Sequence, residues 1–498
     1  MSPGTQALTI IFGIVALGSS IGFLAAKRGR VNLEEWAVAG RGLGLILVWI
    51  LLAGETFTTF SVLGISGWVY SKGGPILYVL VYLALGQIGV FFIGPTLWVL
   101  GRKFGMQTLG DFFAQRYGGR LLSATVALAG VVFLIVYLQL QLTGLGIIVE
   151  VASFERVGRT PAMLVSTAVV ACFVLSSGVR GVVWVSVLKD FLLVAVAVIV
   201  GFGLPYINFG GIGPMFTALI KAKPDYLTMP GGTSNLTHSW FISTVLVNSL
   251  FFTWPHFFGS MYTAKDGDTV RRNSVIMALY VIPLVLIIFA GCTAILICPG
   301  LANGDLALLT AVRKTFPPWL LGVIGGAGAL TAMVPAAIQI LSASTLLAKN
   351  VYRPFFAPDI SDEGIGSVAR FAVGVITVVA LYLALNSSAT LVGLLILAYS
   401  GVAQFAPGIV LGITSRRVTG SGVLAGLLTG IAVAGYLTFT HRDPFLGLNA
   451  GFIGLVFNLL VLAAVSSLTS REPNGFDPPE AVARTPSQSL RGGDSTAV

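Results

Sequence analysis

The sequence predicts an all-α integral membrane protein with about thirteen transmembrane helices. Of the 498 residues, 56% are hydrophobic and only 10% are charged, whereas roughly 25% of the residues in soluble globular proteins are charged. Apolar runs of about 20 residues, long enough to cross a hydrocarbon core roughly 30 Å thick, recur along almost the whole chain. The 61 glycines suit the same class, because small residues allow helices to pack closely in a bilayer.

The expected spans follow one another with short connections. The first run has no basic residue before it and no cleavage site after it, so it predicts a membrane span rather than a signal peptide. Residues 1–469 are therefore assigned to one transmembrane domain, and the polar, proline-containing residues 470–498 to a disordered tail. The spans are predicted at residues 7–26, 45–70, 76–99, 121–147, 161–177, 182–206, 239–262, 274–298, 319–347, 368–386, 389–413, 422–440 and 448–469.

Lysine and arginine residues are distributed unevenly between the connections on the two sides of the membrane. If the N-terminus lies outside, the cytoplasmic connections and the tail carry 20 of the 29 Lys and Arg residues, and the external loops carry 8. Short cytoplasmic loops of membrane proteins are enriched in these residues. We therefore expect a multi-pass protein of the cell (inner) membrane, surrounded by the lipid bilayer, with its N-terminus outside and its C-terminus in the cytoplasm.

Composition and motifs argue against several other classes of protein. The net charge of +10 does not indicate a nucleic-acid partner, because the basic residues lie in short loops rather than in one stripe. The three histidines are scattered along the chain, so no metal site at standard zinc spacing is expected. No phosphate-binding loop occurs, which argues against ATP-driven transport. The sequence predicts no catalytic residues and no cofactor, and the protein is not expected to be an enzyme.

Three ionisable residues at membrane depth are the most informative side chains. Glu55 lies near the middle of the second predicted span, and Lys189 and Asp190 lie in the sixth. Ionisable groups inside a membrane are costly and usually serve a function. For Asp190, a position at a helix end or a purely structural pairing is an equal alternative.

Small and hydroxyl-bearing residues surround Glu55. Gly54, Thr56, Thr58 and Ser61 crowd one stretch of the second span. Such residues can satisfy backbone groups that a helix break sets free, and broken helices form midplane substrate sites in many carriers. The alternative is an unbroken helix whose hydroxyls bond back to its own carbonyls. We expect a break and a substrate site here.

The fourth and seventh spans contribute further polar and aromatic candidates. In the seventh span Pro255 removes one helical hydrogen bond and predicts a kink. His256 follows it and is a candidate proton carrier, since the unperturbed pKa of histidine is about 6.5; packing at the membrane interface is the alternative for it and for Trp254. The candidate substrate-binding residues of these two spans are Tyr137, Gln141, Asn248, Phe251 and Trp254.

Five short segments together resemble the sodium:solute symporter family, and the similarity runs over most of residues 5–470. Each segment is a weak signal alone, but all five occur in the order and on the membrane side that the family shows. They are EEWAVAGRGLG at 34–44, TLGDFFAQRYG at 108–118, GVRGVVW at 178–184, YTAKD at 262–266 and LSASTLLAKNVY at 341–352.

The resemblance implies a fold and a class of substrate. The fold would be the LeuT-type inverted repeat of five plus five helices, formed by spans 2–6 and 7–11, with three peripheral helices. The substrate would bind between the broken second and seventh spans. The residues around Trp254 and His256 are most similar to bacterial monocarboxylate permeases, which implies a small organic acid such as pyruvate, lactate or acetate.

The chain departs from the family pattern at the sodium site. The family binds sodium through backbone carbonyls of the second span, which correspond to Gly54 and Phe57, and through two adjacent hydroxyl residues of the ninth. That hydroxyl pair falls on Val334 and Pro335, which offer no side-chain oxygen. We therefore expect a degenerate sodium site, unless hydroxyls elsewhere in residues 342–345 replace the pair.

A lysine in the sixth span offers a substitute for the missing cation. The acidic residue that the family carries there falls on Ser186, and Lys189 follows one turn later. In some proton-coupled carriers of this fold a lysine occupies the place of sodium, and a buried ammonium can supply positive charge or release a proton. We expect Lys189, with Glu55 or Asp190 as its partner and His256 as a further candidate, to couple transport to protons.

These expectations describe a secondary symporter for a short monocarboxylate with a coupling cation. A sodium-coupled symporter for an amino acid or another small solute is the alternative within the same class. A membrane sensor module is the alternative from another class, and the short tail argues against it.

Overall fold

The computed structural model describes residues 1–26, 38–230, 236–470 and 476, and these are nearly all helical, with no β-strand among them. Within this part of the chain, ten helices are long and apolar enough to span a membrane, and two bent helix pairs bring the number to twelve. One of the ten, α8 (Arg159–Phe209), has 51 residues. At about 1.5 Å per residue it is roughly twice as long as a membrane is thick. Dividing α8 at its internal break gives the thirteen spans that the sequence predicts.

The break in α8 lies at Gly178. This residue has φ 58° and ψ −172°, a backbone conformation that essentially only glycine adopts. The sequence predicts a connection between two spans at residues 178–181. In the structure, residues 179–181 are helical, and the helix is interrupted only at Gly178. A single glycine therefore breaks the helix where a loop was expected.

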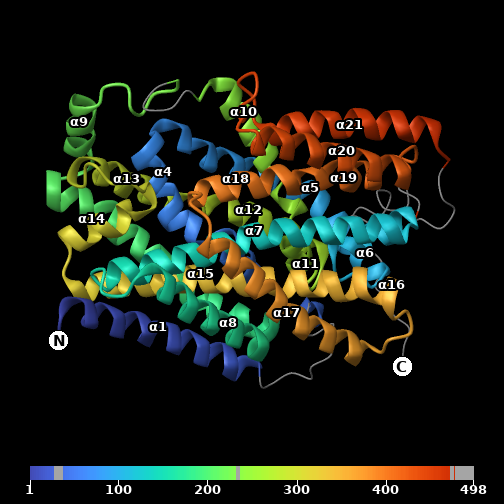
Figure 1. Ribbon diagram of the computed structural model, residues 1–498, viewed down its shortest axis with the longest axis horizontal. Coiled ribbons are helices and arrows are strands. Elements are labelled where there is room, and N and C mark those ends of the chain that lie inside the picture. The colour runs from blue at the N-terminus through green and yellow to red at the C-terminus, as the bar shows by residue number, and fades with distance from the viewer. Residues whose placement is uncertain (27–37, 231–235, 471–475, 477–498) are drawn as a thin grey trace.

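The first five-helix unit begins with a broken span, and α1 lies outside it along one edge of the molecule (Figure 1). The two halves of the broken span are bent by 57°. The elements are α1 (Pro3–Ala26), the broken span α3 (Leu45–Thr56) with η2 (Phe60–Gly64) and α4 (Ile65–Lys72), then η3 (Gly74–Leu77) with α5 (Tyr78–Lys103), α7 (Arg120–Ala152) and the two halves of α8.

The second unit repeats this pattern, with a first span bent by 49°. Helices α20 (Gly420–Phe439) and α21 (Ala450–Leu468) follow it and pack against each other along the edge opposite α1 (Figure 1). The elements of the unit are α10 (His238–Asn248), η4 (Phe251–Thr253) and α11 (Pro255–Met261), then α12 (Gly267–Leu279) with α13 (Ile282–Ile297), α15 (Pro318–Leu346), α17 (Asp362–Leu385), and α18 (Leu391–Val402) with η7 (Ala403–Phe405) and α19 (Ala406–Thr414).

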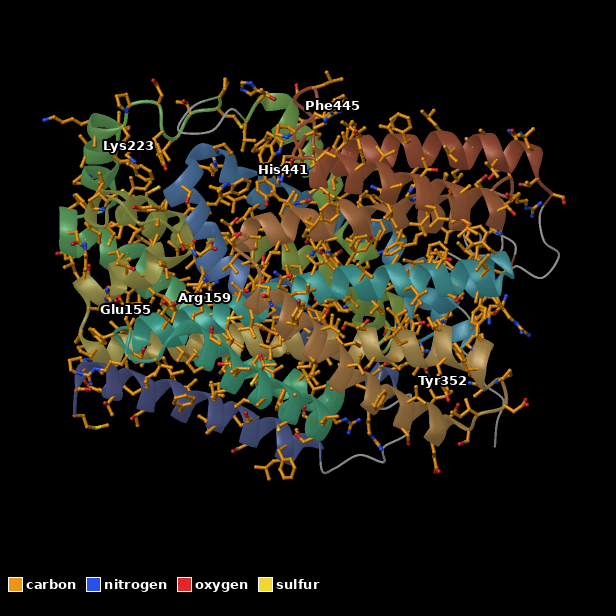
Figure 2. All side chains as sticks on the ribbon, viewed as in Figure 1. Glu155, Arg159, Lys223, Tyr352, His441 and Phe445 are labelled. Atoms are coloured by element: carbon orange, nitrogen blue, oxygen red, sulfur yellow. The ribbon has the colours of Figure 1, made fainter. Side chains whose placement is uncertain are left out.

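Short elements connect the spans at the two ends of the long axis. Glu155, Arg159 and Lys223 lie toward one end, and Tyr352 lies toward the other (Figure 2). The connecting elements are η1 (Ala39–Arg41), α6 (Leu109–Tyr117), α9 (Ile212–Ala222), η5 (Gly304–Leu306), α14 (Ala307–Thr315), η6 (Leu347–Tyr352) and α16 (Arg353–Phe356). Nearly all of the predicted tail 470–498 lies outside the described residues, and its membrane side stays a prediction.

Polar caps explain why some helices begin earlier than the predicted spans. Helix α12 starts at Gly267 rather than at residue 274, because Asp266 Oδ1 accepts a hydrogen bond from the Thr269 N–H at 2.7 Å. Helix α17 starts at Asp362 rather than at residue 368, with Ser361 as its cap. The hydrophobic run marks the part of a helix inside the bilayer, so polar first turns are missed.

Helix α15 forms the centre of the molecule. In the most apolar 18-residue stretch of this span, 94% of the residues are buried. Helices α1, α7 and α8 pack around it. Glycines allow this approach. At Gly322, an added Cβ would lie 2.9 Å from the backbone oxygen of Ala7 in α1. A helix buried on all sides explains why the ninth span is apolar all around, with no amphipathic face.

A buried carboxylate joins two connecting regions at one end of the bundle. Asp305 of η5 is 4% exposed, and its Oδ2 accepts the N–H of Leu391, the first residue of α18, at 3.0 Å. Burial raises the pKa of Asp305 to about 6, although the Leu391 N–H and the charge of Arg159 act in the opposite direction. The folded protein therefore favours the protonated acid more than the unfolded chain does.

This shift predicts a pH-dependent effect of Asp305→Asn. The amide keeps an acceptor for the Leu391 N–H but carries no charge, so the variant avoids the cost of ionising a buried acid. That cost is absent below pH 3.8 and complete above pH 6, and two pKa units correspond to roughly 3 kcal/mol at most. Thermal melting of the detergent-solubilised proteins should show the variant gaining on the wild type as the pH rises from 4 to 7.5. The exposed Asp359→Asn is the matched control, and a difference between Asp305→Asn and wild type that stays constant across this range contradicts the prediction.

Candidate functional site

A cavity lies at the centre of the molecule, where the two broken spans meet. Its walls come from α3 and η2 of one broken span, the break and α11 of the other, and helices α5, α7 and α18. The residues that line it are Glu55, Thr56, Phe60, Tyr82, Tyr137, Phe251, Trp254, His256, Phe257, Leu395 and Tyr399.

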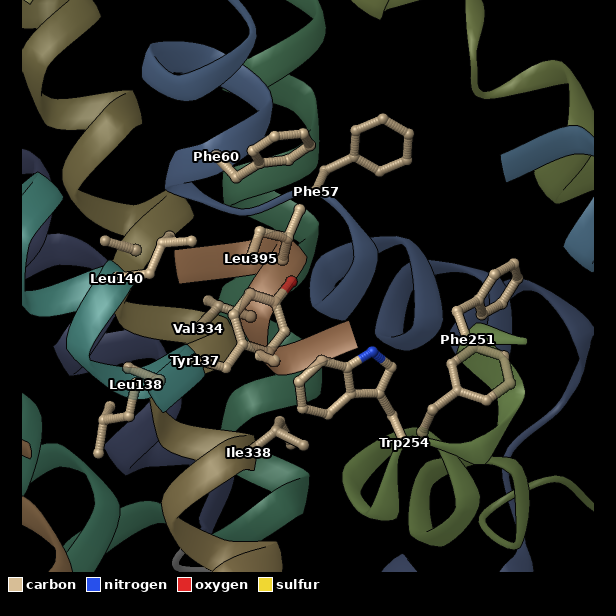
Figure 3. Close-up of a cluster of buried hydrophobic side chains, with 14 of the residues drawn as sticks. Phe57, Phe60, Tyr137, Leu138, Leu140, Phe251, Trp254, Val334, Ile338 and Leu395 are labelled. Carbon is tan, nitrogen blue, oxygen red and sulfur yellow. The ribbon is translucent and has the colours of Figure 1, made fainter. Parts of the chain in front are cut away.

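Aromatic rings form most of the cavity wall. The rings of Tyr137 and Trp254 lie 4.8 Å apart and tilted by 35°, and Tyr399 meets Trp254 edge-on at 5.5 Å. The ring of His256 lies 5.3 Å from Trp254. Figure 3 shows Tyr137 and Trp254 beside each other, with Phe251 on the far side of Trp254. Such walls suit an apolar body that carries a few polar atoms.

The only acid among the residues that line this cavity is Glu55. It is 1% exposed, and its Oε1 is hydrogen bonded to Ser260 Oγ of α11. Within the described residues, its other oxygen has no hydrogen-bond partner. One oxygen of the carboxyl group is therefore fixed by the protein, and the other is left for a proton, a water molecule or a ligand.

The lysine predicted at membrane depth reaches the break of the second span. Lys189 Nζ donates to the carbonyl of Gly54 at 3.1 Å and to the carbonyl of Phe57 at 3.0 Å. The same Nζ lies 2.8 Å from Asp190 Oδ1, and Lys189 is completely buried. The ammonium group therefore occupies the carbonyl pair that the sequence comparison associates with sodium.

Val334 of the ninth span lies beside this carbonyl pair and offers no side-chain oxygen. A Cβ added to Gly54 would lie 3.5 Å from Val334 Cγ1 and 2.7 Å from Ser186 Oγ. The hydroxyl of Ser186 donates to the Val182 carbonyl in its own helix. Pro335, next to Val334, is buried within α15. Whether Val334 and Pro335 stand where the family carries its hydroxyl pair stays a prediction from the sequence.

Hydroxyl groups close the break between α3 and η2. The N–H of Thr58 donates to Ser61 Oγ at 3.3 Å, and the N–H of Phe60 donates to Thr58 Oγ1 at 3.2 Å. The N–H and the hydroxyl of Thr59 both donate to Gln141 Oε1, at 3.3 and 2.9 Å. These contacts satisfy backbone groups that the break sets free, as the residue types predict.

Not all of the predicted substrate-binding residues line the cavity. Four of them do so, together with the coupling candidates Glu55 and His256: Thr56, whose hydroxyl bonds back to Leu52, Tyr137, Phe251 and Trp254. Thr58, Ser61 and Gln141 hold the break instead of lining the cavity. Asn248 is completely buried and away from the lining, and neither polar atom of its side chain has a hydrogen-bond partner in the described part of the chain.

Five residues that line the cavity are missing from the sequence-based set. Tyr82 and Tyr399 come from spans three and eleven, and their rings lie 5.6 Å apart. The sequence shows each of them only as an aromatic residue within an apolar run, which gives no sign of a neighbour in another span. The others are Phe60, Phe257 and Leu395.

A second cavity lies on the other side of α11. The two cavities share one residue, His256. The residues that line it are Gln107, Thr108, Val179, His256, Gly259, Ser260, Ile338, Leu341, Ser342 and Thr345.

An ion pair lies next to the second cavity. Asp111 Oδ2 lies 2.7 Å from Lys349 Nζ and accepts the N–H groups of Gln107 and Thr108, while Asn350 Nδ2 donates to Oδ1 at 3.0 Å. Burial acts to raise the pKa of Asp111, but the Lys349 ammonium and these hydrogen bonds outweigh it and hold the pKa below its usual value. The pair joins α6 to η6.

Comparison with known proteins identifies the family. Residues 36–430 match the model of the sodium:solute symporter family. The chain belongs to this family. It is a membrane symporter for a small solute and not an enzyme, and its partners are that solute, a coupling cation and the bilayer.

Individual relatives cover nearly the whole chain. The Bacillus subtilis (strain 168) protein named uncharacterized symporter YhjB is 39% identical over 479 residues, which are 93% of this chain and 97% of the relative. The monocarboxylate transport permease protein of Rhizobium johnstonii (strain DSM 114642 / LMG 32736 / 3841) is 26% identical over 93% of this chain and 97% of the relative. The substrate-bound, outward-open structure of a Na⁺-coupled sialic acid symporter has a TM-score of 0.79 at 17% identity, and the match covers 94% of this chain and 99% of that one. This last likeness shows the fold.

The ion pair next to the second cavity predicts a coupling energy. Asp111→Asn leaves the Lys349 ammonium without its partner in a mostly buried site, and we expect a loss of about 3 kcal/mol and a lower melting temperature. Lys349→Met likewise leaves the Asp111 carboxylate without its charged partner, so we expect a similar loss. The double variant removes both charges, so its loss should be clearly smaller than the sum of the two single losses, measured by thermal melting of the solubilised proteins. Strictly additive losses contradict this role of the pair.

Proposed function

We propose that the protein is a proton-coupled symporter that imports a short monocarboxylate of the pyruvate, lactate or acetate type. The observation that carries the proposal is the position of Lys189 Nζ, 3.1 and 3.0 Å from the carbonyls of Gly54 and Phe57. A buried ammonium at this place supplies the positive charge that a bound sodium ion supplies elsewhere. The coupling ion is then a proton, and sodium is not required.

Glu55 is the best placed group to carry that proton. Lys189 already has Asp190 as its partner at 2.8 Å, which leaves Glu55 as the acid that lines the cavity. A protonated Glu55 can donate a hydrogen bond to a substrate carboxylate, whereas an ionised Glu55 repels it. Binding of the anion and binding of the proton therefore favour each other, which is the requirement for symport.

The remaining cavity wall suits a small acid with an apolar body. The aromatic rings offer contact surface, and Trp254 Nε1 is a buried hydrogen-bond donor in this wall. The residues that line the cavity include no asparagine, glutamine, lysine or arginine. A sugar, which needs many hydrogen bonds to its hydroxyl groups, is a poor fit.

One observation favours a second candidate. A carboxylate among aromatic rings also suits an ammonium group, through ion pairing and cation–π contact. An amino acid is therefore the alternative substrate, and Glu55 would then remain ionised and bind the substrate directly.

For the orientation, we propose an N-terminus outside and a C-terminus in the cytoplasm of the cell (inner) membrane. The unequal distribution of lysine and arginine between the connections supports this assignment.

Uptake into proteoliposomes under separately imposed gradients tests the coupling ion. With the outside more acidic than the inside, we expect accumulation of at least one of pyruvate, lactate and acetate, and no stimulation by an inward sodium gradient at equal pH. Lys189→Gln should lower pH-driven uptake at least tenfold, because the carbonyl pair loses its cation. The exposed Lys221→Gln is the matched control. Uptake driven by sodium alone, or full pH-driven uptake by Lys189→Gln, overturns the proposal.

Glu55→Gln separates the two candidate substrates. For a monocarboxylate, the neutral amide imitates the protonated acid, so binding should persist at both pH 6 and pH 8 while pH-driven accumulation is lost. For an amino acid such as proline or alanine, the variant should lose binding at least tenfold. Binding of each compound to the purified protein, measured by calorimetry at both pH values, distinguishes the two results.

A further inference from the structure

Three side chains separate the two central cavities. Glu55 lines the aromatic cavity, Ser260 lines the second cavity, and His256 lines both. Glu55 and Ser260 are joined by a hydrogen bond between Oε1 and Oγ. All three residues are less than 5% exposed. The Glu55–Ser260 contact is therefore a direct polar connection between the two cavities.

Ser260 has the geometry of a relay, which distinguishes it from an ordinary buried serine. Many buried hydroxyls in this chain, such as those of Ser66 and Ser274, donate to a carbonyl of their own helix. The hydroxyl of Ser260 instead contacts a carboxyl group 205 residues away in the sequence, on another broken span. A hydroxyl group both accepts and donates, so it can pass a proton without becoming charged overall.

The second cavity offers a polar route beyond Ser260. Its lining includes Gln107, Thr108, Ser342 and Thr345. Gln107 Oε1 accepts a hydrogen bond from Lys349 Nζ at 3.0 Å, which connects the lining to a partly exposed ion pair at the end of the bundle. Water in such a polar cavity can take up a proton and pass it toward this end.

Few other charged or titratable groups surround Glu55. They are His256 on α11, Lys189 with Asp190 on α8, and the tyrosines of the same cavity, Tyr82, Tyr137 and Tyr399. Lys189 bonds to the carbonyls of the break and to Asp190, so it is already engaged. Of these groups and Ser260, only the serine has a hydrogen bond to Glu55 among the described contacts.

We propose that Ser260 is the residue through which Glu55 exchanges its proton with the second cavity. The inference rests on the proposed function, because it assumes that Glu55 carries the coupled proton. In the release step, the O–H bond of protonated Glu55 breaks as its proton passes to Ser260 Oγ. At the same time, the proton of Ser260 passes to a water molecule of the second cavity. Glu55 is left as the carboxylate, Ser260 is again a neutral hydroxyl, and the water carries the positive charge.

The location of the two residues ties this exchange to conformation. Glu55 lies in the last turn of the first half of one broken span, and Ser260 lies in the second half of the other. A change in the angle between these half-helices separates Oε1 from Oγ. The route to the second cavity is then open only while the two half-helices are in contact, which prevents a continuous proton leak through the protein.

Net uptake and exchange measured on the same proteoliposomes test the role of Ser260. Net uptake under a pH gradient requires Glu55 to release its proton inside. Exchange of labelled for unlabelled substrate at equal pH can proceed with Glu55 protonated throughout. We expect Ser260→Ala to lower net pH-driven uptake at least tenfold while exchange stays within twofold of wild type. Ser260→Thr, which keeps the hydroxyl, should retain net uptake, and the buried Ser274→Ala is the matched control.

Other results overturn the inference. Equal losses of net uptake and exchange in Ser260→Ala assign Ser260 a structural role, and an unchanged net uptake assigns it none. If His256→Gln loses net uptake but keeps exchange, and Ser260→Ala does not, the relay residue is His256 instead of Ser260. Failure of the proposed function itself is distinguishable, because the wild-type protein would then show no pH-driven uptake at all. If Ser260→Ala does not fold, loss of net uptake by a folded Ser260→Thr overturns the proposal.

Discussion

The buried ammonium of Lys189 on the carbonyls of Gly54 and Phe57 is the contact on which the centre of this molecule depends. Breaking a helix inside a membrane exposes carbonyl groups that water cannot reach, and each unsatisfied group costs several kcal/mol. Lys189 satisfies two of them at once. Its own charge is in turn compensated by Asp190 at 2.8 Å. The break and the buried ion pair therefore stabilise each other, and neither is expected without the other.

The same break positions the site residues. Glu55 lies between the two carbonyls that Lys189 binds, so fixing them also fixes the carboxyl group at the cavity wall. On the other side of the break, Thr59 is held by Gln141 of α7. A Cβ on Gly144, one turn along the same helix, would collide with the Thr59 side chain. Helix α7 can therefore approach the break closely only because it carries a glycine at this point.

Charged residues within apolar runs can be recognised from the sequence, whereas residues whose contacts lie in distant spans cannot. Glu55 and Lys189 could be predicted because a charge inside an apolar run is costly wherever the run packs. Tyr399 and Ser260 could not, since their importance comes from partners in distant spans. Gln141 is predicted to bind substrate, and in the structure its Oε1 accepts from Thr59 at the break; helical periodicity gives the face of a residue and not the group that it meets. The thirteen spans followed from hydrophobicity, except that a single glycine replaces the loop expected near residue 178.

Under the proposed function, the balance of charge explains why proton and substrate are linked. Lys189 and Asp190 compensate each other, so an ionised Glu55 leaves one uncompensated negative charge in a buried site. An unpaired buried charge is strongly unfavourable, and adding the carboxylate of a substrate would make it worse. Protonation of Glu55 removes this charge and turns one of its oxygens into a donor for the incoming anion. In this proposal, the cavity thus favours anion binding with Glu55 protonated and disfavours anion binding without the proton.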